Sequence, residues 1–205
     1  MKKIFIIISV LLIGFSSCKQ KKKEDSCCKK PETTEETNSV NQSISLFDLS
    51  SSWTTQDKAS VQLKDFKQKV IVLAMIFTHC QSACPRIVAD IQAIEQQIPA
   101  SEKDNVQYVL VSMDPERDNP ERLTEFAKEH QLDTKHWTLL TGTESDVLEI
   151  AGALNVRAIK LQDGSFDHSN IINIINNKGN IVYQQIGLAV NPTASVEKIN
   201  SILQE

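Results

Sequence analysis

Two cysteines, Cys80 and Cys84, stand four residues apart in the stretch FTHCQSACPR (77–86). This C-x-x-x-C spacing is one residue longer than the C-x-x-C motif of thiol–disulfide redox proteins. Two thiolates about one helical turn apart can close a reversible disulfide or bind one soft metal ion. The plainer alternatives are a passive structural disulfide, which would add little stability across so short a loop, and two buried small hydrophobes. The pair therefore predicts a redox site or a metal site, and the surrounding elements must separate the two.

The elements around the cysteines alternate between strands and helices. The runs VIVLAMIF (70–77) and VQYVLVSM (106–113) are mostly apolar, as strands buried on both faces are. Shorter strands are predicted in VQLKDF (61–66), in HWTLLTG (136–142) and on both sides of the turn at Asn177-Lys178-Gly179. Apolar residues spaced three and four apart, or an N-cap followed by proline, predict helices over 87–98, 119–130, 145–154 and 193–203.

This order predicts an α/β domain over residues 44–205, with a thioredoxin-like central sheet, flanking helices and an extra N-terminal β-hairpin. Its length is sufficient for one domain with its own core. In a thioredoxin-like fold the loop between the first long strand and its helix carries the active thiols, and here that loop is FTHCQSACPR. The free N–H groups of a helix N-terminus stabilise negative charge, so this position favours thiolate.

A third residue favours a metal over plain thiol chemistry. Thioredoxins place a cis-proline before the third long strand, facing the thiols, but none of the six prolines lies just before IINII (171–175). The stretch there is FDHSN, which we expect to be a polar loop and which contains His168. Two sulfurs and one imidazole suit copper in either oxidation state, and zinc less exclusively. Cys80, Cys84 and His168 are therefore predicted to bind one metal ion; an exposed loop histidine is the plainer alternative.

The stretches FTHCQSACP, VSMDPERDNP and DHSNIINIINNKGNI resemble, in this order, the three hallmark stretches of the Sco/SenC family of copper-binding proteins. The resemblance covers residues 44–205 and implies a thioredoxin-like domain that binds one copper ion, Cu(I) or Cu(II), through Cys80, Cys84 and His168. Two features depart from the family pattern, because Gln81 replaces a common proline and Gln68-Lys69 replaces the usual lysine–glycine.

The resemblance also implies a function. Family members help to metallate the dinuclear copper centre of respiratory oxidases, by delivering copper, by reducing its cysteines, or by both. The implied partner is a copper-containing respiratory oxidase subunit or a similar copper enzyme, such as a nitrous oxide reductase. The chain is thus predicted to be a copper chaperone rather than an enzyme, although thiol–disulfide reductase activity stays open.

Two other classes of function stay open. The first is an extracytoplasmic thiol–disulfide oxidoreductase without a metal role. The second is a peroxidase-like enzyme in which Cys80 is the peroxidatic thiol and Cys84 resolves it. Thr78 lies only two residues before Cys80, which does not match the T-x-x-C setting of such enzymes.

Several neighbouring residues are weaker candidates. Asp167 could orient His168 by a hydrogen bond, or be a solvated turn aspartate. Asp114 and Arg117 follow a strand end at the sheet edge of the thiols, where they would shape a docking surface or cap the next helix. His79 should point away from Cys80 if it continues the strand, so it is left out of the ligand set. His130 and His136 are predicted to be structural or surface residues, and Met113 to belong to the core.

The N-terminus predicts export and a lipid anchor. A basic start precedes a mainly apolar run over 4–15, which is shorter than the roughly 20 residues of a bilayer span. Ser16-Ser17-Cys18 follows and resembles the lipobox of bacterial lipoproteins. We predict a signal peptide over 1–17, a lipidated Cys18 and a disordered polar tether over 18–43; an uncleaved anchor helix is the alternative.

Either form of anchor places the domain outside the cytoplasm, as a membrane-anchored protein of the bacterial cell envelope that faces the periplasm where there is one. Residues 19–30 hold six lysines, which could lie against anionic head groups or be solvated linker. Cys27 and Cys28 are adjacent within that segment and could bind a soft metal, pair between molecules or have no function. Residues 31–205 carry 14 basic and 24 acidic side chains, which argues against a nucleic-acid partner.

Overall fold

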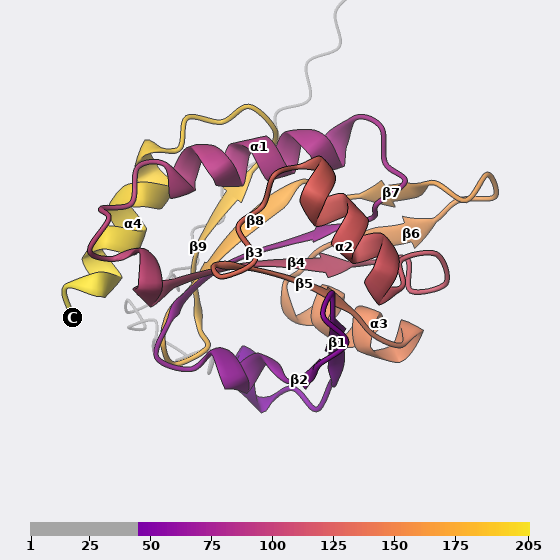
Figure 1. Ribbon diagram of the computed structural model, residues 1–205, viewed down its shortest axis with the longest axis horizontal. Coiled ribbons are helices and arrows are strands. Elements are labelled where there is room, and N and C mark those ends of the chain that lie inside the picture. Colours follow the sequence, from indigo (N-terminus) through magenta and orange to yellow (C-terminus); the bar gives the residue numbers. More distant parts are fainter. Residues whose placement is uncertain (1–44) are drawn as a thin grey trace, which may run out of the picture. The chain divides into compact units, whose positions relative to one another are not determined.

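Figure 1 shows the computed structural model, which describes residues 45–205. The predicted signal peptide, the lipidated Cys18 and the tether with Cys27 and Cys28 lie outside the described residues. Within 45–205, none of the helices has the length and apolar character needed to span a bilayer.

A seven-stranded sheet with the order β2-β1-β5-β4-β3-β8-β9 forms the centre of the domain (Figure 1). Its members are β1 (Trp53–Thr55), β2 (Ser60–Val61), β3 (Val70–Ile76), β4 (Val106–Ser112), β5 (Trp137–Thr141), β8 (Ile171–Ile175) and β9 (Ile181–Ile186). Strands β3, β4 and β5 are parallel, whereas β8 pairs antiparallel with β3 and β9 antiparallel with β8. All seven residues of β3 and of β4 are buried, as their apolar sequences predict.

Four α-helices pack around this sheet: α1 (Ala83–Glu95), α2 (Pro120–Glu129), α3 (Glu144–Ala153) and α4 (Thr193–Leu203). Helices α1 and α4 contact each other and β3, while α2 contacts β5. In Figure 1, α1 and α3 lie on opposite sides of the central strands. The predicted start of α2 is confirmed, because the Asn119 side chain accepts a hydrogen bond from the Arg122 amide at 2.8 Å and Pro120 opens the helix. The predicted α/β class with helices on both faces of the sheet is therefore confirmed.

The N-terminal hairpin is also confirmed, since β1 and β2 pair antiparallel, and β1 joins the main sheet through β5. The prediction of a strand throughout 61–66 was wrong. Only Ser60–Val61 is a strand, and Leu63–Phe66 forms a 3-10 helix, η2. The Asp65 carboxylate accepts a hydrogen bond from the Gln62 amide at 2.8 Å, so a local cap competes with strand pairing in this segment.

The prediction of a polar loop at FDHSN was wrong as well. Residues Phe166–His168 form strand β7, which pairs antiparallel with β6 (Ala158–Lys160) in a separate two-stranded sheet. Each of these strands has three residues, too short a run for the alternation of apolar and polar residues that marks a strand in a sequence. This hairpin places His168 at the end of a strand, directly before the short connection to β8.

Candidate metal centre

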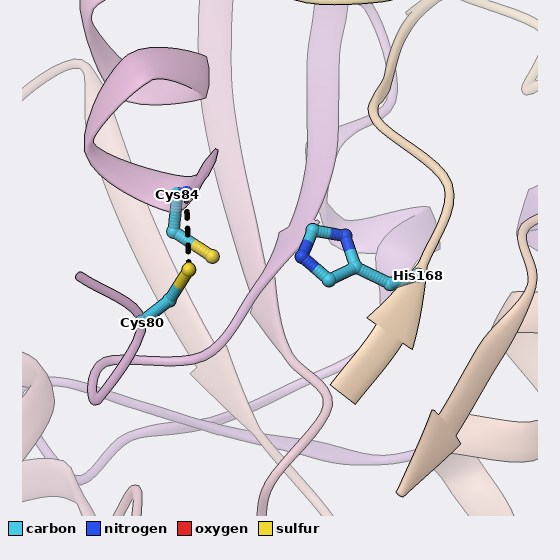
Figure 2. A group of neighbouring side chains, drawn as sticks. All are labelled: Cys80, Cys84 and His168. Atoms are coloured by element: carbon cyan, nitrogen blue, oxygen red, sulfur yellow. Dashed lines mark hydrogen bonds between the residues drawn. The ribbon is translucent and has the colours of Figure 1, made fainter. Parts of the chain in front are cut away.

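Cys80, Cys84 and His168 come together at the carboxyl end of β3 (Figure 2). Cys80 lies in the turn after β3, where its amide donates a hydrogen bond to the Phe77 carbonyl at 3.2 Å. Cys84 lies in the first turn of α1, and His168 is the last residue of β7. One ligand atom from each, two sulfurs and a ring nitrogen, lie within 4.8 Å of one another. The structure thus brings together the three residues that the sequence singled out.

Backbone amides hold both sulfurs. The Cys84 amide donates to the Cys80 Sγ at 3.4 Å, which is the dashed line in Figure 2, and the Phe77 amide donates to the Cys84 Sγ at 3.4 Å. Both residues are free thiols. Cys80 is half-buried, whereas Cys84 is 0% exposed.

The pKa values of the two thiols are shifted in opposite directions. Burial disfavours the Cys80 thiolate, but hydrogen bonds from the amides of Cys84 and Ser82 outweigh it and lower the pKa of Cys80 below its ordinary value. Burial raises the pKa of Cys84 far above its ordinary value, although the Phe77 amide partly opposes the shift. The expected support of thiolate by the helix N-terminus therefore holds for Cys80 and not for Cys84.

His168 is half-buried, and Figure 2 shows its ring pointing toward the two sulfurs. Its Nδ1 lies 3.4 Å from the Ser169 carbonyl, and its ring meets the Phe77 ring edge-on with centroids 5.9 Å apart. The idea that Asp167 orients His168 is not supported. The Asp167 carboxylate instead pairs with the Arg157 Nη2 at 2.8 Å, because successive side chains of a strand point to opposite faces.

An open cavity of about 350 Å³ gives access to the site. Cys80 and His168 line it, together with Phe77, Phe166 and Asn170, whereas Cys84 does not. The Phe77 and Phe166 rings contact each other with centroids 5.0 Å apart and form an apolar wall. A partner molecule would therefore meet Cys80 and His168 first, with Cys84 behind them.

Only the two outer aspartates of the DPERD segment, Asp114 and Asp118, are buried, whereas Glu116 is exposed. Asp114 is 0% exposed and pairs with Arg117 and, at 3.6 Å, with the Lys160 Nζ, which favours the structural alternative for Asp114 and Arg117. The sequence analysis missed Asp118, a fully buried carboxylate that accepts hydrogen bonds from Thr78, two residues before Cys80. Its place after the end of β4, beside the thiol loop, was the only available signal.

The residues set aside as ligands have other contacts. The His79 Nδ1 is 3.6 Å from the Asp118 Oδ1. His130 packs on Phe126, and His136 is buried between Asp104 and Asp133. Met113 is 3% exposed and belongs to the core. For His130, His136 and Met113 this confirms a structural or core role.

Two thiols and an imidazole at these separations support two kinds of chemistry. They can bind one soft or borderline metal ion, because the donors already converge on a common point. The thiol pair alone can also lose two protons and two electrons to form a disulfide. Both uses draw on the same two sulfurs.

Comparison with known proteins identifies one family over the whole domain and relatives of parts of it. The family model SCO1/SenC matches residues 39–204. The SCO1 protein homolog of Bacillus subtilis is 34% identical over 97 residues, which are 47% of this chain and 50% of that protein. The chain thus spans about half the length of the curated relatives it matches.

Solved structures agree in fold over most of the domain. A SCO1/SenC family lipoprotein from Bacillus anthracis is 30% identical with a TM-score of 0.69, covering 77% of this chain and 96% of that one. BsSco, described as a member of the Sco family of cytochrome c oxidase assembly proteins with a disulfide switch, is 25% identical with a TM-score of 0.66, covering 75% and 91%. Bradyrhizobium japonicum ScoI with copper bound shares the fold at 23% identity and a TM-score of 0.64, covering 74% and 96%. These likenesses confirm the predicted thioredoxin-like fold.

Proposed function

Because this chain belongs to the SCO1/SenC family, we propose that it is a copper-binding assembly factor in which Cys80, Cys84 and His168 bind one copper ion. The observation that carries the proposal is the convergence of these three donors within 4.8 Å beside an open cavity. Two thiolates satisfy Cu(I), whereas Cu(II) takes additional nitrogen or oxygen donors, which His168 supplies. Copper is the cargo of this site.

The order of ligand binding follows from the thiols. Cys80 is the accessible thiol with the lowered pKa, so it meets an incoming ion first. Cys84 gives up its proton only when a positive ion compensates for its burial. His168, at the mouth of the cavity, completes the set and is the residue a receiving protein can displace.

We propose that the client is the dinuclear copper centre of a respiratory oxidase, or of a similar copper enzyme such as a nitrous oxide reductase. The family description of BsSco as a cytochrome c oxidase assembly protein supports the oxidase. Either copper transfer or reduction of the client's cysteines would start at Cys80, because it is the thiol that lines the cavity.

A second candidate function is thiol–disulfide exchange without a metal, and the unequal thiols favour it. The Cys80 thiolate would attack a client disulfide and release one client thiolate, leaving a mixed disulfide. Cys84 would then attack the Cys80 sulfur, and its proton would pass to the departing client sulfur, which leaves as a thiol. Two electrons pass to the client, and the Cys80–Cys84 disulfide remains. His168 has no role in this scheme.

We also propose that the domain, residues 44–205, is exported and anchored by a lipid on Cys18 after removal of residues 1–17. The sequence pattern and the lipoprotein form of the Bacillus anthracis relative support this anchor. The domain would then work outside the cytoplasm at a membrane surface.

Copper titration of the reduced protein tests the main proposal. We expect one copper per chain, protection of both thiols from alkylation, and loss of copper once the Cys80–Cys84 disulfide has formed. Absence of stoichiometric copper binding, or full retention of copper by the verified disulfide form, would contradict it. Turnover of a disulfide substrate by the copper-free protein that is unaffected by His168→Ala would favour the second candidate.

A further inference from the structure

The geometry points to Asp118 as the positioning residue of the metal centre, and we propose that it acts through Thr78. This inference rests on the proposed copper site and adds a residue that touches neither the copper nor its ligands. Asp118 would set the separation of the two sulfurs and the imidazole by fixing the turn after β3, whose residue Phe77 contacts all three ligand residues.

The contacts of Asp118 join two strand ends. Its Oδ2 accepts hydrogen bonds from the Thr78 amide at 3.0 Å and from the Ser112 hydroxyl at 2.6 Å, and its Oδ1 accepts one from the Thr78 hydroxyl at 2.6 Å. Asp118 and Ser112 are 0% exposed, and Thr78 is 6% exposed. Thr78 therefore binds the carboxylate through both its backbone and its side chain, while Ser112 ties that carboxylate to the end of β4.

The Thr78 hydroxyl continues the chain of contacts outward. It accepts a hydrogen bond from the Arg122 Nε at 3.1 Å while it donates to Asp118. Arg122 is held in turn by both carboxylate oxygens of Glu129, at 2.9 and 3.0 Å. A side chain at position 78 without a hydroxyl would break this chain in both directions.

Phe77, the neighbour of Thr78, contacts every ligand. Its amide donates to the Cys84 Sγ, its carbonyl accepts from the Cys80 amide, and its ring packs against His168. The Thr78 amide and the Phe77 carbonyl belong to one planar peptide, so the hydrogen bond to Asp118 directly fixes the carbonyl that holds Cys80. The same anchor limits the movement of Phe77, whose amide and ring contact Cys84 and His168. Loss of the hydrogen bonds between Asp118 and Thr78 would therefore affect the positions of all three proposed copper ligands.

The alternative is that this network only stabilises the ends of β3 and β4. Thr78→Val and Thr78→Ser separate the two roles, because valine keeps the shape of threonine without the hydroxyl, whereas serine keeps the hydroxyl. Asp118→Asn keeps the size of the side chain, but its amide NH₂ group cannot accept a hydrogen bond. The variant therefore cannot satisfy all three donors that the carboxylate satisfies. Ser195→Ala is the matched control for stability. Ser195 lies on α4, is 0% exposed and donates a hydrogen bond to the Gln185 Oε1 at 2.7 Å. Helix α4 does not line the cavity, so the control removes a buried hydrogen bond away from the site.

The first measurement is Cu(II) binding with its thiolate-to-copper absorption, alongside thermal unfolding of the copper-free chains. We expect Thr78→Val and Asp118→Asn to weaken Cu(II) binding by about tenfold and to shift the absorption band, as the loss of a hydrogen bond to a charged group predicts. Thr78→Ser should match the wild type, and Ser195→Ala should lose stability without a change in the band. Wild-type affinity and spectrum in Thr78→Val and Asp118→Asn would overturn the proposal.

The second measurement needs no copper and stays decisive if the wild type binds none. Each reduced chain is equilibrated with oxidised glutathione, which takes two electrons and two protons from Cys80 and Cys84 and becomes two reduced glutathione molecules. We expect Thr78→Val and Asp118→Asn to lower the equilibrium constant for the disulfide by about fivefold, because the thiols are less well placed. Equal constants in all variants would overturn the positioning role, whereas a lowered constant in a protein that binds no copper would refute only the copper site.

Discussion

At the scale of single residues, two identical side chains become different because of where their sulfurs lie. The Cys80 sulfur accepts backbone hydrogen bonds in a half-buried turn, while the Cys84 sulfur is enclosed by the core. Hydrogen bonds to a thiolate lower the pKa of its thiol, and desolvation raises it. The pair therefore consists of a reactive outer thiol and a protected inner one.

The acidity difference predicts selective alkylation of the copper-free protein. Near neutral pH, iodoacetamide should modify Cys80 and leave Cys84 unmodified, since only the thiolate reacts. As the pH falls through the lowered pKa of Cys80, its reaction should slow, but at a lower pH than for a free thiol of pKa about 8.5. Peptide mass spectrometry with Cys80→Ser as the control measures this, and equal modification of both cysteines would contradict it.

His168→Ala should separate the two oxidation states of copper. Cu(I) binding should survive on the two thiolates, whereas Cu(II) affinity should fall by more than about 100-fold, beyond the loss typical when only a supporting residue is removed. Folding should change little, because His168 is only half-buried and ends β7, directly before a two-residue connection. Titration of both ions into the variant and the wild type measures the difference. An unchanged Cu(II) spectrum would remove His168 from the ligand set.

At the scale of elements, short connections place the chemistry while long strands supply the rigidity. The turn after β3, the first turn of α1 and the end of β7 each contribute one ligand. Strands β3 and β4 are fully buried, so the turns at their ends start from fixed positions. The turn that leads into β3 is less favourable, because Gln68 has a φ of +73°, a region that side chains with a Cβ rarely adopt.

Gln68→Gly should therefore stabilise the domain. Glycine accepts a positive φ without a steric cost, and we expect the free energy of unfolding to rise by about 0.5–1 kcal/mol. Lys67→Gly is the matched control, because Lys67 is exposed too but has a φ of −46° and should lose stability instead. Urea unfolding of the copper-free chains measures both. A decrease for Gln68→Gly would show that this conformation is not strained.

At the scale of the whole molecule, the parallel strands β3 and β4 end at the same edge of the sheet, where the cysteine turn and Asp118 meet. Such edges are where binding sites of α/β domains gather. The cavity at this edge is open, so under the proposed function a second protein would reach Cys80 and His168 without unfolding of the domain. Buried hydrophobic residues between Leu46 and Ile202 form the core that supports this edge.

The anchor should therefore be separable from the fold. Cys18→Ser should abolish lipid attachment and shift the protein from membranes to the soluble fraction, while copper binding and the unfolding temperature stay unchanged. Fractionation and mass spectrometry of the mature N-terminus measure this. A mature N-terminus other than Cys18 in the wild type, without lipid, would contradict the proposed anchor.

The sequence by itself determined the local features of this protein. The apolar runs of β3 and β4 predict buried strands, Asn119-Pro120 predicts the start of α2, and the spacing of Cys80 and Cys84 predicts a thiol pair at a helix start. Each of these depends on neighbours within a few residues, so the pattern carries the information. His168 was predicted differently, from the ligand set that it would form with the two cysteines and from the resemblance to the three family stretches.

Only the tertiary structure decided how the site works. It made FDHSN a strand, because pairing with β6 supplies hydrogen bonds that a local pattern does not reveal. It shifted the pKa values of Cys80 and Cys84 in opposite directions, because the burial of each sulfur depends on the packing of the whole core. It also brought Asp118 to Thr78, because two strands distant in the sequence end side by side. Desolvation and long-range contact are properties of the folded chain, so no spacing within the sequence could have predicted them.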